Sequence, residues 1–232
     1  MAAIAAACPA AEAMLRRIAV FAALLASAVT AQAQPREDRG AAMGEFDFYV
    51  LSLSWSATWC QITGERRGAR QCDSGRNPGF VVHGLWPQYE RGYPAFCTPD
   101  GRNPSRRAMD IAETVLPDSG LARHQWRKHG TCSGLPPEGY FNAIGAARAK
   151  VRIPAALEAP RDVNRFAPLE IERAFAEANP GLRPDMMAVT CERGMLEEVR
   201  ICLTKDLRSF RPCPEVDRAA CRVREVSVPT AR

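Results

Sequence analysis

The sequence predicts an α+β fold in which helices flank a central, largely antiparallel β-sheet. Patterns typical of strands gather near the beginning and the end of the chain, and patterns typical of helices lie between them, so the two do not alternate as in a parallel α/β fold. Of the 232 residues, 47% are hydrophobic and 25% are charged, which favours a folded chain with a sizeable core over a disordered one. We expect residues 34–232 to form a single domain.

The first 33 residues have the layout of a secretory signal peptide. Two arginines precede an apolar run at 18–29, and the small residues Ala31 and Ala33 mark a cleavage site after residue 33. The run is shorter than the roughly 20 residues that span a bilayer, so we expect no membrane insertion after cleavage. Met14 is an alternative start of the chain. The expected location is the periplasm or the medium.

Two strands are predicted in the first part of the mature chain. Residues 46–55 combine apolar alternation with β-favouring side chains, which indicates a central strand. A short apolar run at 80–83 indicates a buried strand with His83 at its end. Polar or turn-rich segments, for which we expect irregular structure, cover residues 34–45, 63–77 and 87–104.

Four helical patterns follow, and Pro or Gly residues lie near their ends. The predicted helices cover residues 105–116, 121–131, 138–151 and 169–178. Two further apolar runs with Gly194 between them predict a final pair of strands at 185–191 and 195–203.

The cysteine count also indicates an oxidising compartment. One of the nine cysteines, Cys8, lies in the predicted leader, and an even number remains in an exported chain, which favours disulfides. A zinc site is the alternative, but the mature chain contains no C-x-x-C pair. The eight remaining cysteines are Cys60, Cys72, Cys97, Cys132, Cys191, Cys202, Cys213 and Cys221.

The three histidines of the chain are confined to two short segments, residues 80–87 and 124–132. On a helix, residues four apart share a face, so the second segment would present two imidazoles, an ammonium and an amide on adjoining rows. Two imidazoles and a cation suit the transesterification of a phosphodiester: one imidazole accepts a proton, the other donates one, and the cation stabilises the charge on phosphorus. Structural histidines are the alternative. A metal site is disfavoured, because the spacing is not that of H-E-x-x-H and acidic ligands are absent nearby.

The two histidine segments, H-G-L-W-P at 83–87 and H-Q-W-R-K-H-G-T-C at 124–132, resemble the signature blocks of the ribonuclease T2 family. Members of this family are secreted endoribonucleases with little base preference. An upstream L-S-L-S-W segment and a later R-I-C segment followed by cysteines agree with the same pattern, so the resemblance covers residues 46–221.

The resemblance implies a role for each residue of the two blocks. His83 would be the general acid and His129 the general base, which activates the ribose 2′-OH to give a 2′,3′-cyclic phosphate. Lys128 would stabilise the phosphorane, and His124 would bind phosphate. Trp86 would stack on a base, since an aromatic face discriminates little between bases. RNA is thus the expected substrate, and a DNA strand lacks the required hydroxyl.

Aromatic residues in and near these blocks are the remaining candidates. Tyr89 and Tyr93 are candidates for substrate binding, and core packing is the alternative for Trp86 and the expectation for Trp126. No metal or other cofactor is expected, and a monomer is the default state.

One residue departs from the family pattern, because Gln125 stands where the family has Glu. A glutamine keeps the shape and the hydrogen-bonding capacity, but it cannot take up a proton or balance an imidazolium. We therefore expect an enzyme that works more slowly. The alternative is a catalytically weakened RNA-binding protein on the same scaffold. The resemblance also implies the cysteine pairs Cys97–Cys132, Cys191–Cys221 and Cys202–Cys213, which leaves Cys60 for Cys72.

Overall fold

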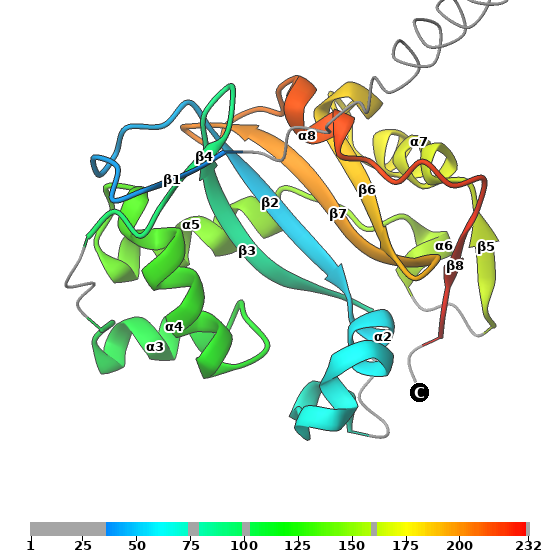
Figure 1. The fold of residues 1–232 in the computed structure, drawn as a ribbon, viewed down its shortest axis with the longest axis horizontal. Coiled ribbons are helices and arrows are strands. Elements are labelled where there is room, and N and C mark those ends of the chain that lie inside the picture. Colours follow the sequence, from blue (N-terminus) through cyan, green and yellow to red (C-terminus); the bar gives the residue numbers. More distant parts are fainter. Residues whose placement is uncertain (1–35, 74–78, 99–102, 159–161, 231–232) are drawn as a thin grey trace, which may run out of the picture. The chain divides into compact units, whose positions relative to one another are not determined.

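Six strands form the main β-sheet of the computed structural model, which describes residues 36–73, 79–98, 103–158 and 162–230 (Figure 1). The predicted leader lies outside these residues. Along the sheet the order is β3-β2-β7-β8-β5, and β6 pairs with β7. The strands are β2 (Phe48–Trp55), β3 (Phe80–Gln88), β5 (Asn164–Phe166), β6 (Met187–Glu192), β7 (Met195–Thr204) and β8 (Val226–Val228).

The pairing in this sheet confirms the predicted fold class. β2 runs antiparallel to both β3 and β7, and β7 runs antiparallel to β6. β8 meets β7 in parallel at a single register position, Met195 with Ser227, and pairs antiparallel with β5. Antiparallel neighbours thus dominate the sheet, as expected when strands and helices are segregated along the chain.

The predicted helices are all present, with ends that differ by a few residues. Ser105 and Asp118 cap two of them, because their side-chain oxygens accept hydrogen bonds from the backbone N–H groups of Ala108 (3.0 Å) and Leu121 (2.8 Å). The helices are α2 (Ser56–Trp59), α3 (Arg106–Glu113), α4 (Ser119–Lys128), α5 (Pro137–Ala149), α6 (Ala155–Glu158), α7 (Pro168–Ala178) and α8 (Pro214–Arg218). In Figure 1, α3, α4 and α5 gather toward β3, and α7 lies toward β6.

The two faces of the sheet differ in what they bury. On one face Leu51 and Leu53 of β2 are fully buried against the main core, to which α5 contributes Phe141 and Ile144. The Tyr140 hydroxyl anchors α5 to the sheet by donating a hydrogen bond to the Leu85 carbonyl (2.9 Å). The other face carries a small apolar cluster of Phe48, Val50, Cys202 and Cys213, and polar side chains occupy the rest of that face nearer the end of β2.

Several segments expected to be irregular contain short regular elements. β1 (Glu37–Arg39), in the polar lead-in, pairs in parallel with β4 (Tyr93–Ala95), in the turn-rich segment. The segment after α2 winds through a π-turn at Cys60–Gly64 and two 3-10 turns at Glu65–Arg67 and Arg70–Cys72. Further 3-10 turns lie at Gly130–Cys132 and Pro184–Met186. Such short elements lack the periodicity that a sequence pattern detects.

Four disulfides link the described part of the chain, with the pairing that the family resemblance implies. They are Cys60–Cys72, Cys97–Cys132, Cys191–Cys221 and Cys202–Cys213. Among the described residues, no helix is long and apolar enough to cross a membrane.

Candidate active site

A bulge in β3 brings His83 and Trp86 onto one face of the sheet. Ser52 of β2 pairs with Gly84 and Leu53 with Val82, so His83 has no partner of its own in the register. In a regular strand, residues three apart point to opposite faces, and the extra residue cancels that difference. The two rings meet edge to face with centroids 5.3 Å apart. The prediction that His83 ends its strand is therefore wrong, because β3 continues to Gln88.

His83 is paired with an acidic residue of β7. Its Nδ1 is hydrogen-bonded to Oε1 of Glu198, a carboxylate whose side chain is only 3% exposed. The other oxygen, Oε2, accepts a hydrogen bond from Arg200 Nε at 2.8 Å. Burial alone would raise the pKa of Glu198, but the hydrogen bond from His83 and the charge of Arg200 outweigh it and lower that pKa to about 2. Glu198 is therefore ionised throughout the neutral pH range.

His129 has very different surroundings. It caps the C-terminus of α4, where its backbone N–H still bonds to the Gln125 carbonyl (2.9 Å), and its ring stacks on Trp86 with centroids 5.3 Å and planes 26° apart. The residue is 5% exposed, and its buried Nδ1 has no hydrogen-bond partner among the described residues. Burial, and then the positive charges of Lys128, His124 and His83, lower the pKa of His129 well below its usual value.

Gln125 is fixed by Trp86 on the same side of α4. The indole Nε1 donates a hydrogen bond to Gln125 Oε1 at 2.9 Å, and the glutamine is 1% exposed. Gly84 permits this approach, because a Cβ atom there would collide with both the Gln125 amide and the Trp86 indole. Trp86 therefore links the two histidine segments: it touches His83, His129 and Gln125 at once.

Lys128 extends from the last turn of α4 toward the β1–β4 pair. Its Nζ lies 5.5 Å from the ring centroid of Tyr93 and 3.7 Å from Glu37 Oε2, which also accepts a hydrogen bond from the Tyr93 hydroxyl (2.9 Å). The Tyr93 ring in turn lies 6.4 Å from that of His129. β1 and β4 thus place an acidic and an aromatic side chain beside the ammonium.

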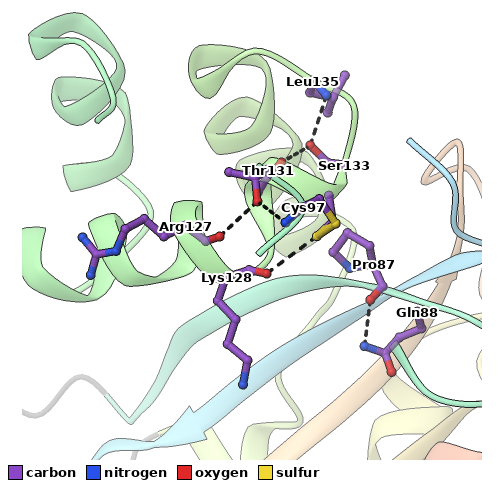
Figure 2. Close-up of a disulfide and its surroundings, with 10 residues drawn as sticks. Pro87, Gln88, Cys97, Arg127, Lys128, Thr131, Ser133 and Leu135 are labelled. Atoms are coloured by element: carbon purple, nitrogen blue, oxygen red, sulfur yellow. Dashed lines mark hydrogen bonds between the residues drawn. A yellow bond between two sulfur atoms is a disulfide. The ribbon is translucent and has the colours of Figure 1, made fainter. Parts of the chain in front are cut away.

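The Cys97–Cys132 disulfide secures the end of α4 beside these groups (Figure 2). Thr131 Oγ1 accepts a hydrogen bond from the Cys97 N–H (3.2 Å) and donates one to the Arg127 carbonyl (3.0 Å). The Phe96 N–H donates to the Lys128 carbonyl (2.9 Å). Figure 2 shows the Lys128 side chain pointing from this end of the helix toward the strands, while Arg127 points away from it. The turn that carries Lys128 and His129 is therefore fixed on both sides.

A cavity of about 660 Å³ is lined by His83, while Trp86 and His129 are not part of its lining. His124 lines it together with His83, and burial, followed by the charges of Lys128, Arg127 and His83, lowers the pKa of His124. Helix α2 contributes Trp59 to the lining, and the segment after it contributes Arg67, Ala69, Arg70 and Gln71. Two guanidinium groups and an indole suit a ligand that combines negative charge with a flat ring.

Comparison with known proteins identifies the family of this chain. Residues 46–213 match the model of the Ribonuclease T2 family. The chain belongs to this family. It is 37% identical over 165 residues to a ribonuclease of Aeromonas hydrophila, an alignment that covers 70% of this chain and 74% of the relative. It is 28% identical over 224 residues to ribonuclease DdI of Dictyostelium discoideum, covering 89% and 96% of the two chains.

Solved structures agree with this assignment. The structure of RNase NT in complex with 5′-AMP aligns with a TM-score of 0.64 and 25% identity, covering 80% of this chain and 99% of that one. The chain is thus a T2-type ribonuclease with the α+β fold of that family.

The structure of this ribonuclease brings together most of the residues that the sequence singled out. Trp86, Gln125, Lys128 and His129 form one connected group with Tyr93. Tyr89 packs against the main core, and burial and the carboxylates of Asp38, Asp47 and Glu45 raise its pKa. Trp126 packs into the main core, 6.0 Å from the Tyr140 ring, as expected.

Sequence reasoning missed three charged residues of the site. Glu198 and Arg200 lie in a strand that the apolar pattern predicted, and the pattern gave no sign that its charged residues meet His83. Glu37 lies in the polar lead-in, for which no ordered element was expected. Among the described residues, no group of three or more His, Cys, Asp or Glu side chains could hold a metal ion.

Proposed function

We propose that this ribonuclease cleaves single-stranded RNA without a metal ion, by attack of a ribose 2′-OH on the adjacent phosphorus. The O2′–P bond forms as the P–O5′ bond breaks, so the products are a 2′,3′-cyclic phosphate and a free 5′-hydroxyl. One imidazole takes the proton of the 2′-OH, and another gives a proton to the departing O5′. The observation that carries this proposal is the contrast between the two imidazoles that contact Trp86.

His129 has the surroundings of the general base. A base must be neutral before it can accept a proton, and burial with three nearby cationic groups favours the neutral imidazole of His129. Its stacking on Trp86 and its place at the end of α4, beside the disulfide, hold the ring in one orientation.

His83 has the surroundings of the general acid. An acid must present a ring nitrogen to the leaving oxygen, and the Glu198 carboxylate in contact with Nδ1 leaves Nε2 of His83 for that task. One imidazole buried among cationic groups and a second one paired with a carboxylate suit the separate tasks of a base and an acid.

The remaining residues of the two blocks have supporting tasks in this proposal. Lys128 stabilises the negative charge that develops on the phosphorane, and His124, at the rim of the cavity, binds a phosphate oxygen. Trp86 offers an aromatic face to a base, which accounts for little base preference. Gln125 orients Trp86 through its amide oxygen. The leader pattern and the four disulfides support export to the periplasm or the medium.

Gln125 also supports a second candidate function. A buried amide in place of a carboxylate cannot balance positive charge on a neighbouring imidazole, so the protein could bind RNA with little turnover. In that case RNA would bind, but no cyclic phosphate would form.

The experiment that separates these functions incubates the purified protein with RNA in the presence of excess chelator. Cleavage that resists the chelator and yields 2′,3′-cyclic phosphates supports the proposal, with a bell-shaped dependence of rate on pH. Cleavage that the chelator abolishes indicates a metal-dependent hydrolase. Binding without cleavage indicates the second function, and a DNA strand of the same sequence serves as the uncut control.

A further inference from the structure

Glu198 is a buried carboxylate to which the two family blocks assign no task. Its side chain is 3% exposed and lies against His83. Oε1 meets His83 Nδ1 and accepts a weaker hydrogen bond from Ser54 Oγ (3.3 Å), and Oε2 accepts from Arg200 Nε (2.8 Å). A buried charge is unfavourable unless it is paired and hydrogen-bonded, and three partners meet that condition here.

Arg200 connects this group to the aromatic centre of the site. Its guanidinium carbon lies 5.4 Å from the Trp86 ring centroid, and its side chain is 30% exposed. Glu198, Arg200, His83 and Trp86 therefore form a closed set in which each side chain contacts two of the others. Bulges at His83 in β3 and at Glu197 in β7 both lie beside it.

We propose that Glu198 is a positioning residue for His83, holding the ring by Nδ1 so that Nε2 faces the substrate and keeps its proton until O5′ departs. This inference rests on the proposed function, because it assigns the general acid to His83. Arg200 acts in turn on Glu198, since it fixes the second oxygen and leaves the first for the imidazole.

Nearly all other charges around His83 oppose its protonation, which makes the carboxylate decisive. The helix α4 places the imidazoles of His124 and His129 near His83, and the lowered pKa of each favours its neutral form. The fixed positive charge is therefore that of Arg200 in β7. The cavity that His83 borders also contains one carboxylate and two guanidinium groups, from Asp118, Arg67 and Arg70. Among the described residues, Glu198 makes the only ion pair with a histidine.

The test replaces Glu198 by glutamine and uses Glu197→Gln as the matched control. Glu197 is the adjacent carboxylate of β7, but its hydrogen bond comes from Thr190 Oγ1 (3.0 Å) and it does not contact His83. Without its carboxylate partner His83 loses its proton at lower pH, so the alkaline limb of the kcat profile of Glu198→Gln should move down by roughly one pH unit. At neutral pH, kcat should fall about tenfold and KM should change less than about twofold. Glu197→Gln should keep the limb of the wild type.

A second variant tests the sign of the effect without removing the buried carboxylate. Arg200→Gln takes away a cation that competes with His83 for Glu198, so its alkaline limb should move to higher pH even where kcat falls. Glu198→Asp keeps the charge and should retain the wild-type limb at a reduced kcat. A purely structural role would lower activity in all three variants and leave every limb in place.

The outcome for this inference can be told apart from that for the proposed function. If the wild type does not cleave RNA, the proposed function fails, and histidine NMR still measures the pH at which the His83 imidazole loses its proton. That pH should be lower in Glu198→Gln than in Glu197→Gln. If the two variants share both the NMR midpoint and the alkaline limb, Glu198 does not act through His83 and the inference is wrong.

Discussion

The buried carboxylate of Glu198 should make the free energy of unfolding of this protein depend on pH in the acidic range. The pKa of Glu198 is about 2 in the folded protein, against 4.5 for an ordinary glutamate. At about 1.4 kcal/mol for each pH unit, this difference stabilises the folded state by about 3 kcal/mol. Because the folded-state pKa is the lower one, the stabilisation is complete above pH 4.5 and is lost as the pH falls toward 2.

The measurement compares the free energy of unfolding of the wild type with that of Glu198→Gln across pH 2 to 7. Urea titrations followed by tryptophan fluorescence suit it. Acidification also destabilises the folded protein through His129, because the folded-state pKa of His129 lies well below its usual value. This effect is present in both proteins and therefore cancels in the difference. The difference should stay constant above pH 4.5 and shrink by about 3 kcal/mol toward pH 2.

The refuting result is a difference in unfolding free energy that does not change with pH. It would mean that Glu198 titrates alike in the folded and unfolded states, and hence that His83 and Arg200 do not hold its charge. Glu197→Gln again serves as the control. Burial and the charge of Glu198 raise the pKa of Glu197, so its removal should change stability with the opposite pH dependence.

Three further predictions concern activity and stability. Replacing either His83 or His129 by alanine should lower kcat at least about 100-fold with an unchanged circular dichroism spectrum, and a variant that kept most of its activity would contradict the assigned roles. Gln125→Glu should cleave polyuridylate faster than the wild type; an equal or lower rate would show that the amide costs no activity. Replacing Cys97 and Cys132 by serine opens a link that spans 35 residues and should cost about 4 kcal/mol of unfolding free energy, with a loss of activity in parallel. If urea unfolding gave the same free energy for this variant as for the wild type, the result would argue against the Cys97–Cys132 disulfide.

The long elements of this fold were predictable because their side chains repeat with the period of a strand or a helix. The alternation in β2 and the capped helices α3 and α4 are examples. β1 could not be predicted, since Glu37-Asp38-Arg39 has no apolar face and gains its order from pairing with β4, more than 50 residues away. β8 has only three residues, which is too few for a pattern.

The site was predictable where it is local in sequence and not where it depends on the sheet. His124 and Lys128 lie four residues apart on α4 and His129 caps the same helix, so their proximity could be predicted from their spacing. The contact of His83 with Glu198 joins residues 115 positions apart. It depends on the order of β3, β2 and β7, and on bulges that shift which side chains face the site, so no local pattern reveals it.

We have proposed that His83 and His129 transfer protons during attack by a ribose 2′-OH. Phosphorus-31 NMR of uridylyl-(3′,5′)-adenosine incubated with the wild type and excess chelator tests it most directly. We expect that the 2′,3′-cyclic phosphate resonance grows as the diester disappears, that His83→Ala and His129→Ala stop this, and that the 2′-deoxy substrate stays intact. Cleavage of the 2′-deoxy substrate, or direct release of a linear phosphate without the cyclic species, would contradict it.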